Sequence, residues 1–568
     1  MLRWLVQYWT VTLGAKSTEE LDAEHYLFVV ATGLHSVASV NCVAFNRWYL
    51  LLASCLAMLA AGTLLAFSTL YDALDVYMYG SQTKTSVTVL YQAYIWMGLS
   101  AAISGPFIER RGPRIGMTVA TMLLAVGFTL AQLAVTTKAQ LFLTIGYGFF
   151  CGGGFGMAIV STMTASQKWF PDIRGLTAGL CMCSFGAGTV AGANVYKAFL
   201  NRGGFVQVVT NVRNIPHVFW TTGLVIVLTM IVVTLVIRTP PVSFTVNGHD
   251  IHGVPESKAP DPNLVQDEYL QLGELDGTDV HYFQQVKALS LVQCICSTDF
   301  FCMYIAFAAS IIPAMVFSSE FVAINTKVFG QSVDVTNSSK VQGLIVNLAG
   351  QLTIPVISDL IIRVCYANPA YARKIVFFFI LSAQLGSMAA LSSENMTFES
   401  VRSLSFTYVF GSGGSMALIQ CFVTDMFGVY HAGTMYGLVF TCWSLRSAIV
   451  GYGFADFQVT RVSFRNQMQW MLVVVAIGWV ALLFVRTNSV DRFFYGYKYS
   501  VCGKVMVQIA FHRHETTNDK DHDDSLTILA PPKVSPASND FVLWNGYDHV
   551  RTSGVQHPQA RQDTSDNA

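Results

Sequence analysis

Residues 105–116 read GPFIERRGPRIG, and they join the end of one apolar segment to the start of the next. Gly112 permits a tight turn, and Glu109 can lie at the positive N-terminal end of a neighbouring helix while pairing with an arginine. Such a cluster would hold two rigid halves together and break when they rock. The alternative is that the charges only orient the chain in a membrane. The latch residues predicted on this loop are Gly105, Glu109, Arg110, Gly112 and Arg114.

The composition around this loop excludes a soluble enzyme. Of 568 residues, 53% are hydrophobic and 12% are charged, whereas soluble domains carry about 25% charged residues. Lys+Arg and Asp+Glu both number 34, so the net charge gives no support for nucleic-acid binding. Most of the 12 cysteines lie in apolar segments, which favours buried thiols over disulfides. No metal spacing, cofactor motif or catalytic constellation is present.

Apolar stretches of the length that crosses a bilayer recur along the chain. They predict an all-α polytopic membrane protein of about twelve helices in two six-helix bundles with pseudo-two-fold symmetry. The predicted spans are 48–70, 86–108, 115–135, 139–161, 175–196 and 218–237, then 294–317, 341–362, 374–393, 402–424, 433–455 and 468–485.

Polar segments frame the two bundles. The predicted organisation is an N-terminal cytosolic or interfacial segment (1–46), a first bundle (47–238), an acidic linker (239–290), a second bundle (291–487) and a polar, disordered tail (488–568). Residues 26–44 are apolar but contain polar side chains, so we expect a packed or interfacial helix there rather than another span. Basic residues in the even-numbered loops place both termini in the cytosol of a multi-pass protein, with the plasma membrane as default and an organellar membrane as the alternative.

The motif GPFIERRGPRIG resembles the signature of the major facilitator superfamily between helices 2 and 3. Asp359 and Arg363 at the end of the eighth span are a weaker copy of it, so we add them to the predicted latch. Three passages look like the oxalate/formate antiporter, nodulin-like and monocarboxylate transporter group. They are NRWYLLLASCLAMLAAGTLLAFS from Asn46, GYGFFCGGGFG from Gly146 and KWFPDIRGLTAGL from Lys168.

Arg446 lies about midway along the eleventh span, where an ionisable residue is costly and therefore a candidate functional group. Its guanidinium could hold a carboxylate through two parallel hydrogen bonds. The alternative is an arginine paired to a buried acid or to backbone carbonyls. The resembled antiporters carry a cation in helix 8 where this chain has Gln351, and their helix-11 lysine aligns near Trp443. The missing cation argues against a dicarboxylate and for a monoanion, a zwitterion or a neutral solute.

Other polar side chains extend this candidate site. Tyr91, Gln92 and Tyr94 on the second span offer neutral hydrogen bonds, although membrane aromatics more often only pack. Asp299 near the start of the seventh span could carry a coupling proton if it is buried, and the alternative is a solvated acid at a helix start.

These observations predict a secondary transporter of a small organic solute, foremost a monocarboxylate or another organic anion, working by alternating access. Without a nucleotide-binding motif, the driving force would be a gradient of solute, proton or counter-solute. Its partners would be that small molecule and the lipid bilayer, with no cofactor and no enzymatic activity. Two alternatives remain, a transporter-like nutrient sensor without net flux and a carrier for a neutral or zwitterionic solute.

Overall fold

The structure is a computed structural model, and it describes the backbone of a defined part of the chain. The described residues are 8, 18–31, 37–81, 84–200, 215–241, 244–247, 249–251, 286, 289–365, 367–393, 396–453, 461–492, 496–501 and 504–510.

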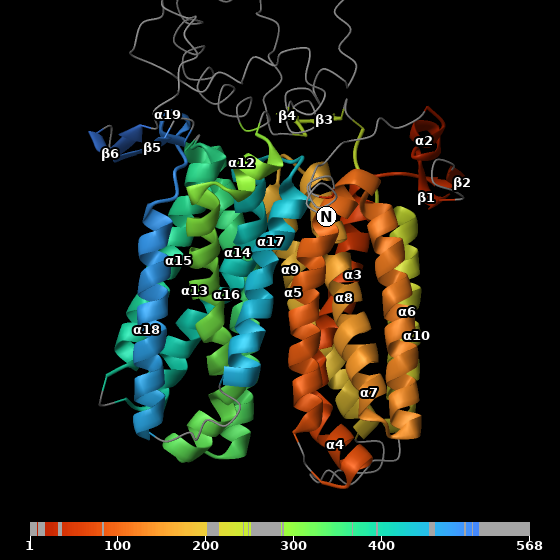
Figure 1. Cartoon of the computed structure of the whole chain (residues 1–568), viewed down its shortest axis with the longest axis vertical. Coiled ribbons are helices and arrows are strands. Elements are labelled where there is room, and N and C mark those ends of the chain that lie inside the picture. The colour runs from red at the N-terminus through yellow and green to blue at the C-terminus, as the bar shows by residue number, and fades with distance from the viewer. Residues whose placement is uncertain are drawn as a thin grey trace, which may run out of the picture.

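Among the described residues, twelve long helical segments are present. They form two groups that lie side by side (Figure 1). The first half contains α3 (Arg47–Ala66), α5 (Thr85–Arg111), α6 (Pro113–Thr137), α7 (Gln140–Leu143) continuing through the π-helix η2 (Thr144–Cys151) into α8 (Gly152–Trp169), α9 (Arg174–Leu200) and α10 (Ile215–Val236). The second half contains α13 (Thr298–Ala323), α14 (Val333–Cys365), α15 (Pro369–Leu391), α16 (Phe398–Phe427), α17 (Ala432–Ala448) continuing into η5 (Ile449–Gly453), and α18 (Arg461–Leu483). The prediction of an all-α fold with twelve spans in two bundles is confirmed.

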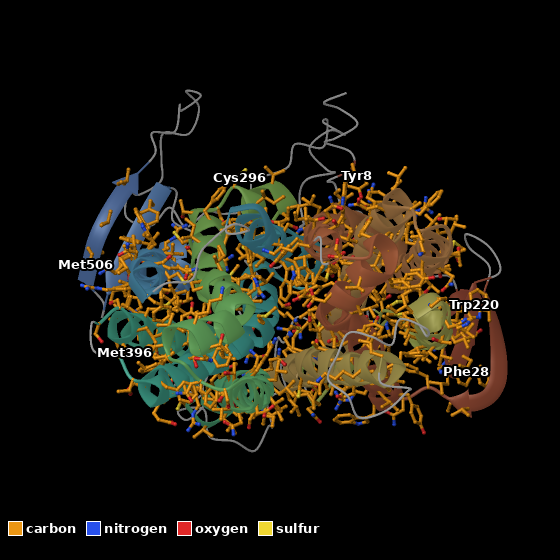
Figure 2. The ribbon with its side chains drawn as sticks, turned by 90° about the horizontal axis from the view of Figure 1, so that it is seen from below. Tyr8, Phe28, Trp220, Cys296, Met396 and Met506 are labelled. Carbon is orange, nitrogen blue, oxygen red and sulfur yellow. The ribbon has the colours of Figure 1, made fainter. Side chains whose placement is uncertain are left out.

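Within the described residues, ten of these segments are long and apolar enough to cross a bilayer on their own. The other two, α13 and α17, both belong to the second half. Several outward faces are strongly apolar, as on α10, where Trp220 is 60% and Val225 64% exposed. Figure 2 shows Trp220 at the periphery of the bundle. Apolar side chains on an outer helix surface are suited to lipid rather than to water.

Local signals fix where the helices begin. Asp75 in the short helix α4 (Tyr71–Tyr79) accepts hydrogen bonds from the amides of Thr85 (3.1 Å) and Ser86 (2.9 Å), and so caps the start of α5. Gly112 has a φ of +86°, a conformation that favours glycine, and it separates α5 from α6. Pro113 then takes the first helical position, where its missing N–H costs nothing.

Residues 26–44 do not form the helix that we expected. They form an antiparallel hairpin of β1 (Tyr26–Ala31) and β2 (Val37–Ala44). Leu27 and Val29 are buried while Val30 is 42% exposed, so burial alternates with the period of a strand. β-branched residues in both strands favour this outcome over a helix.

The segment after α18 is also more ordered than predicted. A helical turn, α19 (Ser489–Arg492), precedes a second hairpin of β5 (Gly496–Val501) and β6 (Lys504–Ala510). Of the predicted tail, residues 493–495, 502–503 and 511–568 lie outside the described part of the chain. In the linker, β3 (Thr245–Val246) pairs with β4 (His249–Asp250), and α12 (Leu291–Ile295) leads into the second half.

The halves meet along two helix pairs. α5 packs against α17, and α9 packs against α14. On the first pair, a Cβ atom placed on Gly105 would lie 2.7 Å from the Cα atom of Thr434, so only glycine fits there without a shift. We call the end of the bundle that carries the loop 105–116 the latch face (upper end in Figure 1) and the opposite end the far face.

Candidate functional site

Glu109 joins the two halves at the latch face. Its Oε1 accepts a hydrogen bond from the amide of Gly433 (2.7 Å), beside the first residue of α17 in the opposite half. Its Oε2 pairs with Lys168 of its own half at 2.5 Å. The carboxylate therefore lies at a positive helix end, as the sequence suggested, but its charged partner is a lysine rather than the expected arginine.

Asp359 forms the matching contact from the second half. Its two oxygens accept hydrogen bonds from the amides of Gly175 (3.1 Å) and Leu176 (2.9 Å), at the start of α9. Arg373 of the second half pairs with the same carboxylate at 2.7 Å. The latch thus contains two carboxylates, one from each half, that both bind a helix start across the seam.

A buried ion pair strengthens this face. Arg174 at the start of α9 pairs with Asp425 near the end of α16 at 2.7 Å, and both side chains are almost fully buried. Arg373 also contacts Asp425, at 3.1 Å. Breaking one partner of such a pair leaves a buried charge uncompensated, so separating the halves here requires water or a new partner to replace each contact.

The remaining predicted latch residues divide between two surroundings. Arg363 donates to the carbonyl of Asp172 in the other half at 2.7 Å, so it crosses the seam. Arg110 instead lies over the ring of Tyr8, 5.0 Å from its centroid, and Arg114 pairs with Glu24 at 3.8 Å. Both of these arginines face the N-terminal segment.

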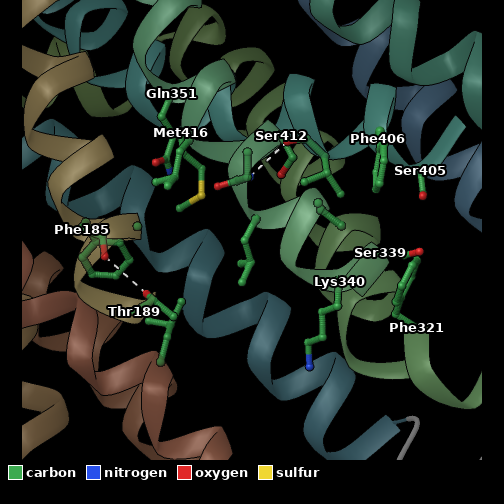
Figure 3. A pocket seen from close by; sticks show the side chains of 18 of the residues that line it. Phe185, Thr189, Phe321, Ser339, Lys340, Gln351, Ser405, Phe406, Ser412 and Met416 are labelled. Carbon is green, nitrogen blue, oxygen red and sulfur yellow. Dashed lines mark hydrogen bonds between the residues drawn. The ribbon is translucent and has the colours of Figure 1, made fainter. Parts of the chain in front are cut away.

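A cavity of about 180 Å³ lies between the halves, away from the latch. Figure 3 shows Phe185 and Thr189 of α9 on one side and Ser339, Lys340 and Ser405 of the second half on the other. The first half supplies a largely apolar wall, whereas most polar lining groups come from α14, α16 and α17. Its volume is that of about six water molecules, which suits a solute of a few heavy atoms.

Arg446 lines this cavity. Its guanidinium carbon lies 4.3 Å from the ring centroid of Trp443, in a cation–π contact. Its Nε is buried without a hydrogen-bond partner, and none of the described side chains offers it a carboxylate in ion-pair range. The alternative of an arginine paired to a buried acid therefore finds no support among the residues that the structure describes.

Two further predicted residues line the same cavity, Gln351 and Trp443. The Oε1 of Gln351 is buried and unpartnered, and the same holds for the indole Nε1 of Trp443. Tyr94 lies behind the lining, with its ring 6.2 Å from that of Trp443. These groups surround Arg446 with an aromatic wall and with hydrogen-bonding atoms that a solute could satisfy.

Tyr91 and Gln92 do not line the cavity. The ring of Tyr91 packs at the seam, where a Cβ atom on Gly451 would lie 2.6 Å from its Cγ atom. Gln92 faces Gly148 inside the first half. The sequence placed all three residues of this stretch in one polar group, but adjacent helical residues point in different directions.

Asp299 lies apart from the cavity. It is 1% exposed, so it is not a solvated acid, and it pairs with Arg486 at 2.9 Å. It also accepts the amide of Arg486 at 2.7 Å. These contacts tie the start of α13 to the chain after α18, and the predicted role in proton coupling stays a prediction.

The sequence reasoning missed Lys340. This lysine is exposed and lines the cavity from α14, 11 positions before Gln351. A helix rises about 1.5 Å per residue, so Lys340 lies roughly 16 Å nearer the far face. Two cations therefore line the cavity, Lys340 and Arg446, whereas the sequence led us to expect only Arg446. Lys340 was not predicted as a site residue because it lies next to the start of the predicted span 341–362. Charged residues are common at the ends of membrane spans.

Known proteins match the chain in sequence and in fold. The oxalate:formate antiporter of Oxalobacter formigenes is 29% identical over 203 residues. That match covers 34% of this chain and 43% of the antiporter, which is less than half of the relative's length.

Two solved structures share the fold. A proton:xylose symporter superposes with a TM-score of 0.53 and 13% identity, covering 77% of this chain and 94% of the symporter. The Escherichia coli fucose:proton symporter superposes with a TM-score of 0.51 and 11% identity. That match covers 77% of this chain and 99% of the symporter. Finally, the sequence model of the Major Facilitator Superfamily matches residues 50–452. The chain therefore belongs to the Major Facilitator Superfamily and is a multi-pass membrane protein.

Proposed function

We propose that this transporter carries a small organic anion, foremost a monocarboxylate, by alternating access. The observation that carries the proposal is the guanidinium of Arg446, which lines a cavity between the halves with no described carboxylate beside it. A carboxylate is the complementary ligand, because its two oxygens match the parallel N–H groups of a guanidinium. The related antiporter transports organic anions by its name, which agrees with this choice.

The contacts at the latch support a cycle in which the halves rock about the cavity. Glu109, Asp359 and Arg174 hold the latch face closed, and the lining residues lie beyond them toward the far face. On α9, Phe185 is 11 residues past Arg174, about 16 Å along the helix axis. The structure corresponds to a carrier whose cavity is shielded from the latch face, and the opposite state requires the latch contacts to break.

We also propose that the latch face is cytosolic. The basic residues Arg110, Arg111 and Arg114 on one loop, and Arg363 on another, meet at this face, as the positive-inside rule requires. Both termini and the linker would then be cytosolic, in the plasma membrane by default.

The test is transport by the purified full chain in proteoliposomes. Labelled formate, lactate, oxalate and a neutral sugar would be compared at two pH values, with and without counter-solute inside. We expect saturable flux of monocarboxylates by the unmodified chain. In Arg446→Gln the flux should fall by at least about 100-fold, because hydrogen bonds to a charged group contribute up to about 3 kcal/mol of binding free energy.

A matched control is Arg402→Gln, because Arg402 is an arginine of α16 that forms an exposed pair with Glu399. Its flux should equal that of the unmodified chain, since such pairs contribute little. Strong oxalate exchange without any monocarboxylate flux would contradict the monoanion assignment. Saturable binding of a monocarboxylate without flux would favour the sensor instead.

A further inference from the structure

The hairpin that follows the last span carries a cluster of apolar and aromatic side chains on one of its faces. Pairing of β5 with β6 sets Tyr497 opposite Ile509 and Tyr499 opposite Val507. Residues that face each other across two strands project on the same side, so these four side chains share one face. We call it the hairpin apolar face. On the other side Lys498 is opposite Gln508, and Ser500 is opposite Val505, which is 49% exposed.

The tyrosines of this face contact the chain just after α18. The hydroxyl of Tyr497 donates to the carbonyl of Phe484 at 3.4 Å, and the ring of Tyr499 lies 6.0 Å from that of Phe484. The guanidinium of Arg486 lies 4.8 Å from the centroid of the Tyr497 ring. The hairpin apolar face is therefore turned toward the end of a membrane-spanning helix, and Lys498 is turned away from it.

The bundle covers only part of this face. Val507 is 38% and Ile509 55% exposed, and both belong to β6. Tyr497 is only partly buried, and this burial raises the pKa of its hydroxyl to about 12. An exposed, apolar, unpaired edge strand is prone to aggregate in water, so a neighbouring surface is needed to cover it.

The position of the hairpin indicates which surface that is. Figure 1 shows β5 and β6 beside the bundle, just past the latch-face end of α18, and Figure 2 shows Met506 at the rim outside the helices. The spans end at this level, and here the hydrocarbon of a bilayer gives way to its headgroups. Tyrosine is enriched at that boundary, where its ring meets lipid and its hydroxyl meets water.

We propose that the hairpin Gly496–Ala510 is an interfacial membrane anchor that lays its apolar face on the lipid of the latch-face leaflet. Val507 and Ile509 enter the boundary between acyl chains and headgroups, and Lys498 and Gln508 face water. The anchor would fix the end of α18 at the membrane surface while the halves rock. This inference depends on the membrane fold and not on the identity of the solute.

The test uses the full chain in nanodiscs of phosphatidylcholine with 20% phosphatidylserine. An environment-sensitive fluorescent amino acid is incorporated at position 509 or, as the matched control, at position 508. We expect lipids carrying a nitroxide near the headgroup to quench the probe at 509 at least threefold more than the probe at 508. Aqueous iodide should show the reverse order.

Quenching at 509 by iodide alone would overturn the anchor, because the face would then be in water. Quenching by neither agent would also overturn it, because protein would then cover the face. A second comparison places the probe at 509 in Val507→Asp and in Gln508→Asp. Lipid quenching should fall severalfold only in Val507→Asp, and equal quenching in both variants would contradict the proposal.

Discussion

Glu109 and Asp359 make the same contact in opposite directions. Each carboxylate lies in the last two turns of a helix of one half, Glu109 on α5 and Asp359 on α14. Each accepts backbone amides at the start of a helix of the other half. Each is also paired with a cation of its own half. The positive end of a helix attracts a carboxylate without help from a side chain, so the latch can form wherever the two backbones align. The repeated motif thus has a physical role in both halves.

Removing one of these charges should loosen the latch. In Asp359→Asn the amide keeps the shape of the carboxylate, but it binds the α9 amides more weakly and leaves Arg373 partly uncompensated. Cys421 reports on the opening, because its thiol is buried and donates to the carbonyl of Arg174 across the seam at 3.3 Å. Labelling of Cys421 by a membrane-permeant maleimide, followed by peptide mass spectrometry, should speed up about tenfold, which corresponds to about 1.4 kcal/mol.

The control for this experiment is Glu399→Gln, which removes an exposed acid from the pair with Arg402. It should leave the labelling rate of Cys421 unchanged. An unchanged rate in Asp359→Asn would show that this carboxylate does not hold the halves together.

A methyl group on Gly105 should separate α5 from α17. In Gly105→Ala the Cβ atom would lie 2.7 Å from the Cα of Thr434, and backbone cannot move aside as a flexible side chain can. We expect the closed-latch state to lose about 1–3 kcal/mol of stability. This loss would be measured as a lower Tm and as faster labelling of Cys421. Gly386→Ala is the matched control, since nothing lies within 4 Å of a Cβ there and alanine favours the helix. Equal Tm changes in both variants would refute the close-packing argument.

Lys340 should act on the capture of an anion rather than on its passage. It is exposed and lines the cavity, so its charge can attract anions over a distance that salt screens. In Lys340→Gln we expect KM for the transported anion to rise about three- to tenfold at low salt, with kcat nearly unchanged, and the difference to shrink above about 0.5 M salt. Lys84→Asn, at the far-face start of α5, is the control. A fall in kcat at unchanged KM would place Lys340 in the rocking step instead.

The parts of this molecule that were predictable from sequence are those set by local chemistry. Twelve apolar stretches become twelve helical segments because a backbone in lipid must satisfy its own hydrogen bonds. Arg446 stood out because a charge inside a span is costly, whatever surrounds it.

Features that depend on distant neighbours were missed or misread. Residues 26–44 were expected to be a helix, yet they form a hairpin whose first strand is held by Arg238. The guanidinium of Arg238 donates to the carbonyls of Tyr26 (2.8 Å) and Leu27 (2.5 Å). The sequence near residue 26 gives no indication that Arg238, more than 200 positions away, is the hydrogen-bond partner. Lys340 likewise became a cavity residue only through the way α14 faces α9.

Gln351 should determine which anion charge the cavity accepts. Its side chain is 3% exposed, its Oε1 has no hydrogen-bond partner, and it lines the cavity together with Arg446. A second cation at this depth would leave a bound monoanion with one positive charge uncompensated in a poorly solvated place, whereas a dianion would satisfy both. Gln351→Lys should therefore raise the ratio of oxalate to formate kcat/KM at least tenfold, a difference of about 1.4 kcal/mol. Gln351→Met keeps the volume without a charge and should leave the ratio within about twofold. If Gln351→Met changes the ratio as much as Gln351→Lys, shape rather than charge governs selection, and the monoanion preference would need another origin than the neutral residue at this position.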